Sequence, residues 1–455
     1  MPTMSVGKST AVVNVHVESE TVKARIPSDF IGFGYETSII AVPNYFGPAN
    51  ATLVQLYRNL GAHGLIRIGG NVSDHTQYVP EGVAVVSPET GVTVINESGL
   101  KDFAEFARVV GWKVMWGLNL GTGTKEEAVE EAIAVDRHLG IQLQSLEIGN
   151  EVDLRGKYTT PFSDFAGYHS YYIDYKKAIR TALPRAVFSG PDVYVNMEIL
   201  KAFAETEAKD IELLTYHYYR TAKHKPEATM ENLLRTQENW VSRLTQLSQI
   251  SRDSGRPYRI NEINSFSGGG KLGISDTFAS ALWCLDNMFL LASYGCSGVN
   301  METDINQFTW ISHYSPIKRD PAMRCYATPE YYGMLAFSMA GRGDLLNVRL
   351  EKGDCNVTAY ATRESNGALW VTIINKDLST DAQLAVETST RYSSAEAFRL
   401  KAPAVDSTEH VTLAGAEVSP DGSWLPKVSE RMPVKQGVAQ LSVPRASAVL
   451  LRFGD

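Results

Sequence analysis

Residues 113–151 read KVMWGLNLGTGTKEEAVEEAIAVDRHLGIQLQSLEIGNE and contain one complete structural repeat. The runs Lys113–Leu120 and Gln144–Glu151 favour β-strands, and Lys125–Leu139 between them has the pattern of an amphipathic helix. A strand, a helix and a second strand in this order predict parallel strand pairing. The stretch therefore indicates an α/β fold.

The same alternation extends outward in both directions, from about residue 28 to about residue 305. The other strand-like runs are Phe30–Glu36, Leu65–Asn71, Val187–Val193, Leu213–Tyr219, Tyr258–Asn264 and Gly298–Thr303. The other helix-patterned stretches are Ala51–Ala62, Leu100–Val110, Phe165–Ala182, Glu198–Glu207, Met230–Arg252 and Ser275–Ala292. Eight β/α repeats predict a closed (β/α)8 TIM barrel. An open, doubly wound sheet is the alternative.

After about residue 335 the pattern changes to short alternating strands separated by turns. Asn366-Gly367 is a strong hairpin signal, and the succession of strands indicates a β-sandwich. We expect the run Ala11–Val17, which precedes the barrel, to add a strand to that sandwich. The expected domains are residues 1–20 as this N-terminal strand, 21–330 as the barrel and 331–455 as the sandwich.

Composition restricts the class of protein. The chain has 455 residues, 44% of them hydrophobic and 21% charged, as in ordinary globular proteins. Its net charge of −8 argues against nucleic acid or an anionic membrane as partner. No apolar run reaches the length of a membrane span, and Met1–Thr10 lacks the apolar segment of a signal peptide. The compartment stays open.

Candidate catalytic residues follow from the barrel, because catalytic groups lie at the C-terminal ends of its strands. Glu151 and Glu262 close the fourth and seventh strands, on nearly opposite sides of the barrel axis. Two carboxyl groups facing each other across the barrel mouth are what glycoside hydrolysis requires. Asn150, directly before Glu151, could bind the sugar hydroxyl next to the reacting carbon.

These motifs resemble known enzymes. Asn150-Glu151 with Glu262 resembles the large clan of retaining (β/α)8 glycosidases that is named for its glutamates on strands four and seven. The segment Glu262–Gly270, EINSFSGGG, resembles the nucleophile segment of the heparanases and β-glucuronidases of glycoside hydrolase family 79. Arg67–Asp74 and Thr215–Tyr219 resemble two further blocks of that family.

The resemblance implies a role for each candidate. Glu151 would be the general acid/base and Glu262 the nucleophile. Backbone amides of Gly268 and Gly269 would receive the glucuronate carboxylate, with help from the hydroxyls of Tyr218 and Tyr314. The remaining candidates for substrate binding lie at other strand ends: Asn150, Glu36, Asn71, Asp74 and His217. His217 is expected to orient its neighbours.

The sequence thus predicts a retaining, exo-acting β-glucuronidase that removes terminal β-linked glucuronic acid from a glycan, as a monomer with no metal or organic cofactor. A long sulfated polymer would require several Lys/Arg clusters, and Arg220–Lys225 and Lys318-Arg319 are thin ones. The alternatives are a heparanase-like endo-β-glucuronidase, another retaining glycosidase of the clan such as a β-xylosidase or β-glucosidase, and a carbohydrate-binding barrel without catalysis.

Overall fold

The computed structural model describes residues 9–81, 92–154, 164–303, 312–389 and 392–454. Eight parallel strands close into a barrel in the order β10-β11-β2-β3-β6-β7-β8-β9. In chain order these strands are β2 (Gly32–Glu36), β3 (Leu65–Gly69), β6 (Lys113–Leu118), β7 (Leu143–Ile148), β8 (Phe188–Val193), β9 (Ile211–Ala222), β10 (Tyr258–Ser267) and β11 (Val299–Glu302). The closed barrel excludes the open-sheet alternative.

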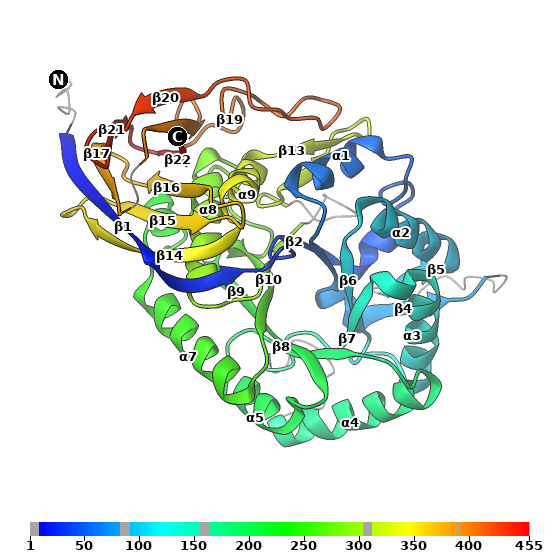
Figure 1. Cartoon of the computed structure of the whole chain (residues 1–455). Helices are drawn as coiled ribbons and strands as arrows, with labels where there is room; N and C mark the ends of the chain where they lie inside the picture. The colour runs from blue at the N-terminus through cyan, green and yellow to red at the C-terminus, as the bar shows by residue number, and fades with distance from the viewer. Residues whose placement is uncertain (1–8, 82–91, 155–163, 304–311, 390–391, 455) are drawn as a thin grey trace.

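Helices follow the strands and surround the barrel (Figure 1). They are α1 (Ala51–Leu60), α2 (Glu97–Val110), α3 (Lys125–Leu139), α4 (Phe165–Ala182), α5 (Met197–Glu207), the short α6 (Met230–Leu234), α7 (Glu238–Ser254), α8 (Phe278–Ser293) and α9 (Pro329–Ala340). Three 3₁₀ turns, Thr37–Ala41, Asn71–His75 and Gly140–Gln142, and two strand pairs outside the barrel complete this part: β4 (Thr76–Val79) with β5 (Thr93–Asn96), and β12 (Ile317–Arg319) with β13 (Cys325–Ala327).

Helix α2 shows why the sequence forms these elements. Its apolar residues recur every three or four positions, so that they lie on one buried face of the helix. Asn96 Oδ1 accepts a hydrogen bond from the Gly99 amide at 2.9 Å and caps the first turn. Gly111, at φ 78°, ends the helix in the left-handed conformation that glycine adopts readily.

Helix α9 completes the eighth repeat, and the amphipathic pattern did not predict it. Almost every residue of α9 is buried, so the helix lacks the polar face by which the others are recognised. It packs against α8 so closely that a Cβ atom at Gly333 would lie 2.4 Å from the Ala281 carbonyl oxygen. The boundary expected at residue 330 falls within the first turn of α9.

The C-terminal strands form one sheet of ten strands together with the N-terminal strand β1 (Ser9–Ile26). They are β14 (Gly343–Glu351), β15 (Val357–Arg363), β16 (Leu369–Asn375), β17 (Thr380–Thr388), β18 (Ser394–Lys401), β19 (Thr412–Leu413), β20 (Glu430–Pro433), β21 (Val438–Val443) and β22 (Ser447–Gly454). Strand β1 pairs with β14 and β17 before the chain enters the barrel at β2 (Figure 1). Part of the sheet's buried side chains form a core of their own, and others, such as Trp370 and Leu450, belong to the core that includes the barrel. The predicted fold class is confirmed.

The barrel and the sheet meet at a buried ion pair. Lys376, which follows β16, donates to Asp286 Oδ2 of α8 at 2.5 Å. Asp286 Oδ1 accepts hydrogen bonds from Thr358 and Tyr360 of β15, at 2.5 and 2.9 Å. These contacts hold the pKa of Asp286 below its ordinary value although burial raises it. The described part of the chain contains no helix with the length and apolar character needed to cross a membrane.

Candidate active site

Glu262 lies in the middle of β10 and points into the mouth of the barrel. Its Oε2 accepts a hydrogen bond from Arg67 Nη1 at 2.7 Å, and its Oε1 accepts one from the Tyr219 hydroxyl at 2.8 Å. The two donors fix the orientation of the carboxyl group. The side chain is buried and largely shielded from water.

Glu151 reaches the same space from the end of β7. The chain leaves that strand through Gly149, at φ 84°, and Glu151 itself is at φ 46°. A positive φ is costly for a residue with a side chain and is most often found at functional sites. A Cβ atom at Gly149 would approach Leu120 Cδ2 to 2.8 Å, so this turn requires glycine there. The turn directs the Glu151 carboxyl group toward Glu262.

His217 of β9 lies between the two carboxyl groups. Its Nδ1 is 3.4 Å from Glu151 Oε1 and 3.6 Å from Glu262 Oε2. Burial lowers the pKa of His217, but Glu262 and the hydrogen bond to Glu151 outweigh it and raise this pKa above its ordinary value. A protonated His217 would place a positive charge between the two carboxyl groups.

Arg67 of β3 connects the site to the barrel interior. Besides Glu262, it donates to Asn150 Oδ1 at 2.7 Å, Asp192 Oδ2 at 3.0 Å and Glu147 Oε2 at 3.2 Å. Burial lowers the pKa of Arg67, but these carboxylates outweigh it and hold this pKa above its ordinary value. The guanidinium is fully buried and fixed by four acceptors. It can therefore hold the side chains of Glu262 and Asn150 in fixed positions relative to each other.

Arg67 also contacts a second pair of carboxyl groups, those of Glu147 and Asp192. Burial and the neighbouring Asp192 raise the pKa of Glu147 well above its ordinary value. Burial also raises the pKa of Asp192, but Arg67 and His217 outweigh it and lower this pKa. Asn261 Nδ2 donates to both, at 2.9 and 2.6 Å. A neutral Glu147 beside an ionised Asp192 reduces the negative charge beneath the two glutamates at the mouth.

Tyr219, and not Tyr218, lies on the side of β9 that faces Glu262; Tyr218 was predicted to help bind the glucuronate carboxylate. Tyr218 points to the other side of the barrel wall, where its ring stacks on Trp240 of α7 at 3.6 Å and its hydroxyl donates to Gln237 at 2.9 Å. Side chains alternate along a strand, so Tyr219 shares the inner face with His217 and Tyr218 does not. Burial and Glu262 keep the pKa of Tyr219 well above its ordinary value, so its hydroxyl stays a donor.

The glycine segment after β10 forms one wall of the mouth. Gly268 and Gly269 have φ angles of 84° and 87°, a region that favours glycine. Among the described residues, neither amide N–H finds an acceptor, and Gly268 is exposed. Tyr314 packs nearby, its ring stacked on that of Tyr219 at 6.2 Å. The segment can therefore present free N–H donors to an anion.

The side chain of Lys223 runs along Gly268, within 3.5 Å of the position of a Cβ atom there. The neighbouring Lys271 donates instead to the Ala228 carbonyl at 2.7 Å. Lys223 is thus a cationic residue beside this wall, and the sequence analysis named it only as part of the cluster Arg220–Lys225.

Of the other predicted substrate-binding residues, Asn71 lies beside the catalytic pair, whereas Glu36 and Asp74 accept hydrogen bonds from backbone amides. Asn150 donates to Asn71 Oδ1 at 3.1 Å, which places Asn71 beside the catalytic pair. Glu36 accepts a hydrogen bond from the Val72 amide at 2.7 Å and lies against Gly70. Asp74 is buried, and its Oδ1 accepts from the Leu120 amide at 3.1 Å, so it supports the loop after β6.

The sequence analysis gave no role to Arg67, Tyr219 or Asp192, although the first two carried recognisable signals. Arg67 stands in the apolar run LIRIG, and a charged residue inside an apolar strand requires buried counter-charges. Tyr219 is two positions from His217 and therefore on the same face of β9. Asp192 gave no signal, because its contact with Arg67 depends on how β3 and β8 lie across the barrel.

Glu151, His217 and Glu262 each offer one ligand atom, and these atoms lie within 4.8 Å of one another. Arg67 Nη1 lies 2.7 Å from Glu262 Oε2, so a cation bound there would be close to the buried guanidinium, which disfavours a metal. The same spacing brings a carboxyl oxygen of Glu151 close to one of Glu262.

Comparison with known proteins defines the class: the chain is a glycoside hydrolase. Residues 356–450 match the glycosyl hydrolase family 79 C-terminal beta domain, which confirms the resemblance to family 79 that the barrel motifs indicated. A β-glucuronidase of Aspergillus niger is 26% identical over 409 residues, 78% of this chain and 74% of the relative. A β-glucuronidase of Neurospora crassa is 24% identical over 375 residues, 71% of this chain and 65% of the relative.

Solved structures show the same fold. A 4-O-α-L-rhamnosyl-β-D-glucuronidase from Fusarium oxysporum superposes with a TM-score of 0.80 at 18% identity, over 96% of this chain and 99% of the other. An α-L-arabinofuranosidase from Thermotoga maritima superposes with a TM-score of 0.70 at 14% identity, over 97% and 99%. The combination of a barrel and a sheet therefore occurs in glycosidases that are named for different sugars.

Proposed function

We propose that this protein is a retaining, exo-acting β-glucuronidase. The observation that carries the proposal is the close approach of Glu151 and Glu262, with carboxyl oxygens within 4.8 Å of each other. Retaining glycosidases keep their two carboxyl groups about 5–5.5 Å apart, whereas inverting enzymes need room for a water molecule between them. The short spacing supports double displacement.

In the first step the Glu262 carboxylate attacks the anomeric carbon while the Glu151 carboxyl group gives its proton to the glycosidic oxygen. The aglycone leaves, and the sugar is bound to Glu262 as an ester. In the second step Glu151 takes a proton from water, which displaces Glu262 and restores both groups. Arg67 and Tyr219 fix the orientation of the nucleophile throughout.

The choice of glucuronate rests on the glycine wall next to the nucleophile. The exposed Gly268 and the buried Gly269 directly follow β10, the strand that carries Glu262, and the aliphatic part of the Lys223 side chain lies against Gly268. Together they suit a carboxylate better than a neutral hydroxymethyl group. Tyr314, beside the same wall, can add a hydroxyl. The β-glucuronidase names of the two relatives support the same choice.

Exo action is preferred to endo cleavage because the chain carries a net charge of −8. A cleft that holds a long sulfated polymer on both sides of the cleaved bond would need several cationic clusters along it. A single terminal glucuronate needs only one carboxylate pocket.

The test is hydrolysis of 4-nitrophenyl β-glucuronide beside the matching β-glucoside and β-xyloside, between about pH 3 and pH 7. Strong preference for the glucuronide is expected. Preference for a neutral sugar would overturn the carboxylate pocket and leave another glycosidase of the clan. If all three stay uncleaved, a cyclophellitol-type epoxide distinguishes an endo-acting enzyme, which gains one adduct on Glu262, from a binder, which gains none.

A further inference from the structure

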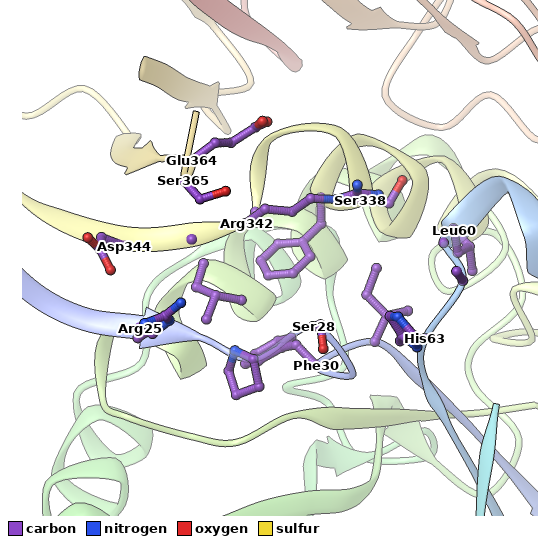
Figure 2. Close-up of a pocket in the computed structure, with 18 of the residues that line it drawn as sticks. Arg25, Ser28, Phe30, Leu60, His63, Ser338, Arg342, Asp344, Glu364 and Ser365 are labelled. Atoms are coloured by element: carbon purple, nitrogen blue, oxygen red, sulfur yellow. The ribbon is translucent and has the colours of Figure 1, made fainter. Parts of the chain in front are cut away.

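A cavity of about 670 Å³ lies between the base of the barrel and the sheet (Figure 2). Ile31 and His63, which line it, directly precede β2 and come shortly before β3, so it is at the N-terminal ends of the barrel strands. Glu151 follows the C-terminal end of β7, at the opposite end of the barrel. The cavity is therefore separate from the candidate active site.

Charged residues from four segments surround this cavity. Arg25 of β1 pairs directly with Asp344 of β14, which in turn pairs with Arg363 of β15. Directly paired residues point to the same face of a sheet, so two guanidinium groups flank one carboxylate. Arg342 adds a third from the turn after α9, and its Nη2 lies 3.7 Å from the position of a Cβ atom at Gly61.

The two carboxylates of the cavity are held in different ways, and only Asp344 has an ion pair among the described residues. Asp344 lies 3.8 Å from Arg363. Glu364 accepts hydrogen bonds from the Trp370 indole at 2.9 Å and from Asn366 at 3.2 Å.

The arginines are not equally engaged. Arg363 also donates to the Ser19 carbonyl at 2.9 Å. The exposed side chains of Arg25 and Arg342, in contrast, have no hydrogen bond or ion pair to any residue that the structure describes. The three arginines that line the cavity outnumber its two carboxylates by one, so its lining has a small net positive charge in a chain of net charge −8.

Size and lining restrict the anion that would fit. The cavity is larger than one phosphate needs and lies in the range of small-molecule sites. Figure 2 shows Arg25 and His63 at opposite sides in that view, with Arg342 between them. The rings of Phe30 and Phe337, stacked 5.1 Å apart, are each only 1% exposed, so the surface open to a ligand is mainly polar and includes the exposed Ser28. Spaced cations and polar groups suit an elongated ligand with more than one polar group.

We propose that this cavity is a second, non-catalytic glycan site that binds a short oligosaccharide through its carboxylate groups. Guanidinium groups recognise carboxylates with paired hydrogen bonds, which favours the unpaired Arg25 and Arg342 as the binding groups. The choice of a uronate sugar rests on the proposed function. Holding an acidic glycan here would raise the local concentration of substrate chain ends around the enzyme.

The test measures binding of α-linked trigalacturonate by titration calorimetry, since this trisaccharide contains no β-glucuronide bond. Its methyl ester, which lacks the charges, is the matched ligand control. In the double variant Arg25→Gln, Arg342→Gln the affinity for trigalacturonate should fall about 10-fold or more, as expected on losing charge-assisted hydrogen bonds. Arg185→Gln, at an exposed arginine outside the cavity, should bind as the unmodified protein does.

Unchanged affinity in the double variant, or equal binding of the methyl ester, would overturn the proposal. So would inorganic phosphate that binds as tightly and competes with trigalacturonate, because the cavity would then be a site for small anions. Hydrolysis of 4-nitrophenyl β-glucuronide should be the same in all variants, which shows that they fold. A protein that binds trigalacturonate but cleaves no glucuronide would contradict the proposed function and leave this site intact.

Discussion

Glu262 receives both of its hydrogen bonds from groups that cannot easily lose a proton. Arg67 and Tyr219 each have a pKa held above the ordinary value. They therefore remain donors over the whole pH range in which a glycosidase works. Buried neighbours keep the nucleophile oriented, so its reactivity should depend on each of them.

Tyr219→Phe removes one of these donors and leaves the ring in place. A hydrogen bond to a charged group contributes about 1.5–3 kcal/mol, so kcat should fall about 10-fold or more. Tyr218→Phe is the matched control, because that hydroxyl bonds Gln237 outside the barrel. Steady-state kinetics on 4-nitrophenyl β-glucuronide measures both. Equal loss in the two variants would contradict the role given to Tyr219.

Glu151→Ala removes the proposed proton donor. Substrates with poor leaving groups should then lose far more activity than activated aryl glycosides, because only the former need protonation of the glycosidic oxygen. Azide should restore turnover of the aryl glycoside and yield a β-glycosyl azide. Equal loss on both kinds of substrate, without azide rescue, would exclude Glu151 as acid/base.

At the scale of single elements, α3 carries a buried acid against the barrel. Glu131 accepts a hydrogen bond from the Trp116 indole of β6 at 2.8 Å, and burial raises the pKa of Glu131 to about 8. Folding therefore retains a proton that the unfolded chain loses near its ordinary pKa of about 4.3. The contribution of Glu131 to the free energy of unfolding is therefore fully present below about pH 4.3, and it decreases as the pH rises toward 8.

Glu131→Gln should remove this loss, since an amide oxygen can still accept from Trp116. Urea denaturation at several pH values should show similar stability of the two proteins near pH 4, and an advantage of the variant that grows up to pH 8. One pKa unit corresponds to about 1.4 kcal/mol. An advantage that does not change with pH would mean that Glu131 is ionised in the folded protein.

The elements also show how far sequence reasoning reaches. The barrel strands were predicted because each is an apolar run followed by polar residues, and parallel pairing follows from their alternation with helices. The face on which a side chain lies was harder to predict. The pairing of β9 with β10 shifts between Ile260 and Glu262, and a shift of this kind depends on the assembled barrel. Helix α9 was missed because burial on all sides removed its periodicity.

At the scale of the whole molecule, the barrel and the sheet share one buried ion pair, between Asp286 and Lys376, whose side chains are 12% and 1% exposed. Removing one partner of a buried pair leaves the other charge uncompensated, which costs about 3–5 kcal/mol. Lys376→Met should therefore lower the free energy of unfolding by about that amount. Adding Asp286→Asn should recover much of the loss, because no buried charge then remains unpaired.

Because the ion pair joins the barrel and the sheet, its loss should destabilise both. Urea unfolding of Lys376→Met, followed by tryptophan fluorescence and by circular dichroism, should show the barrel and the sheet shifting together to a lower midpoint. A shift confined to one of the two signals would mean that each part derives its stability from its own core, and that the contacts of Asp286 with Thr358 and Tyr360 do not couple them.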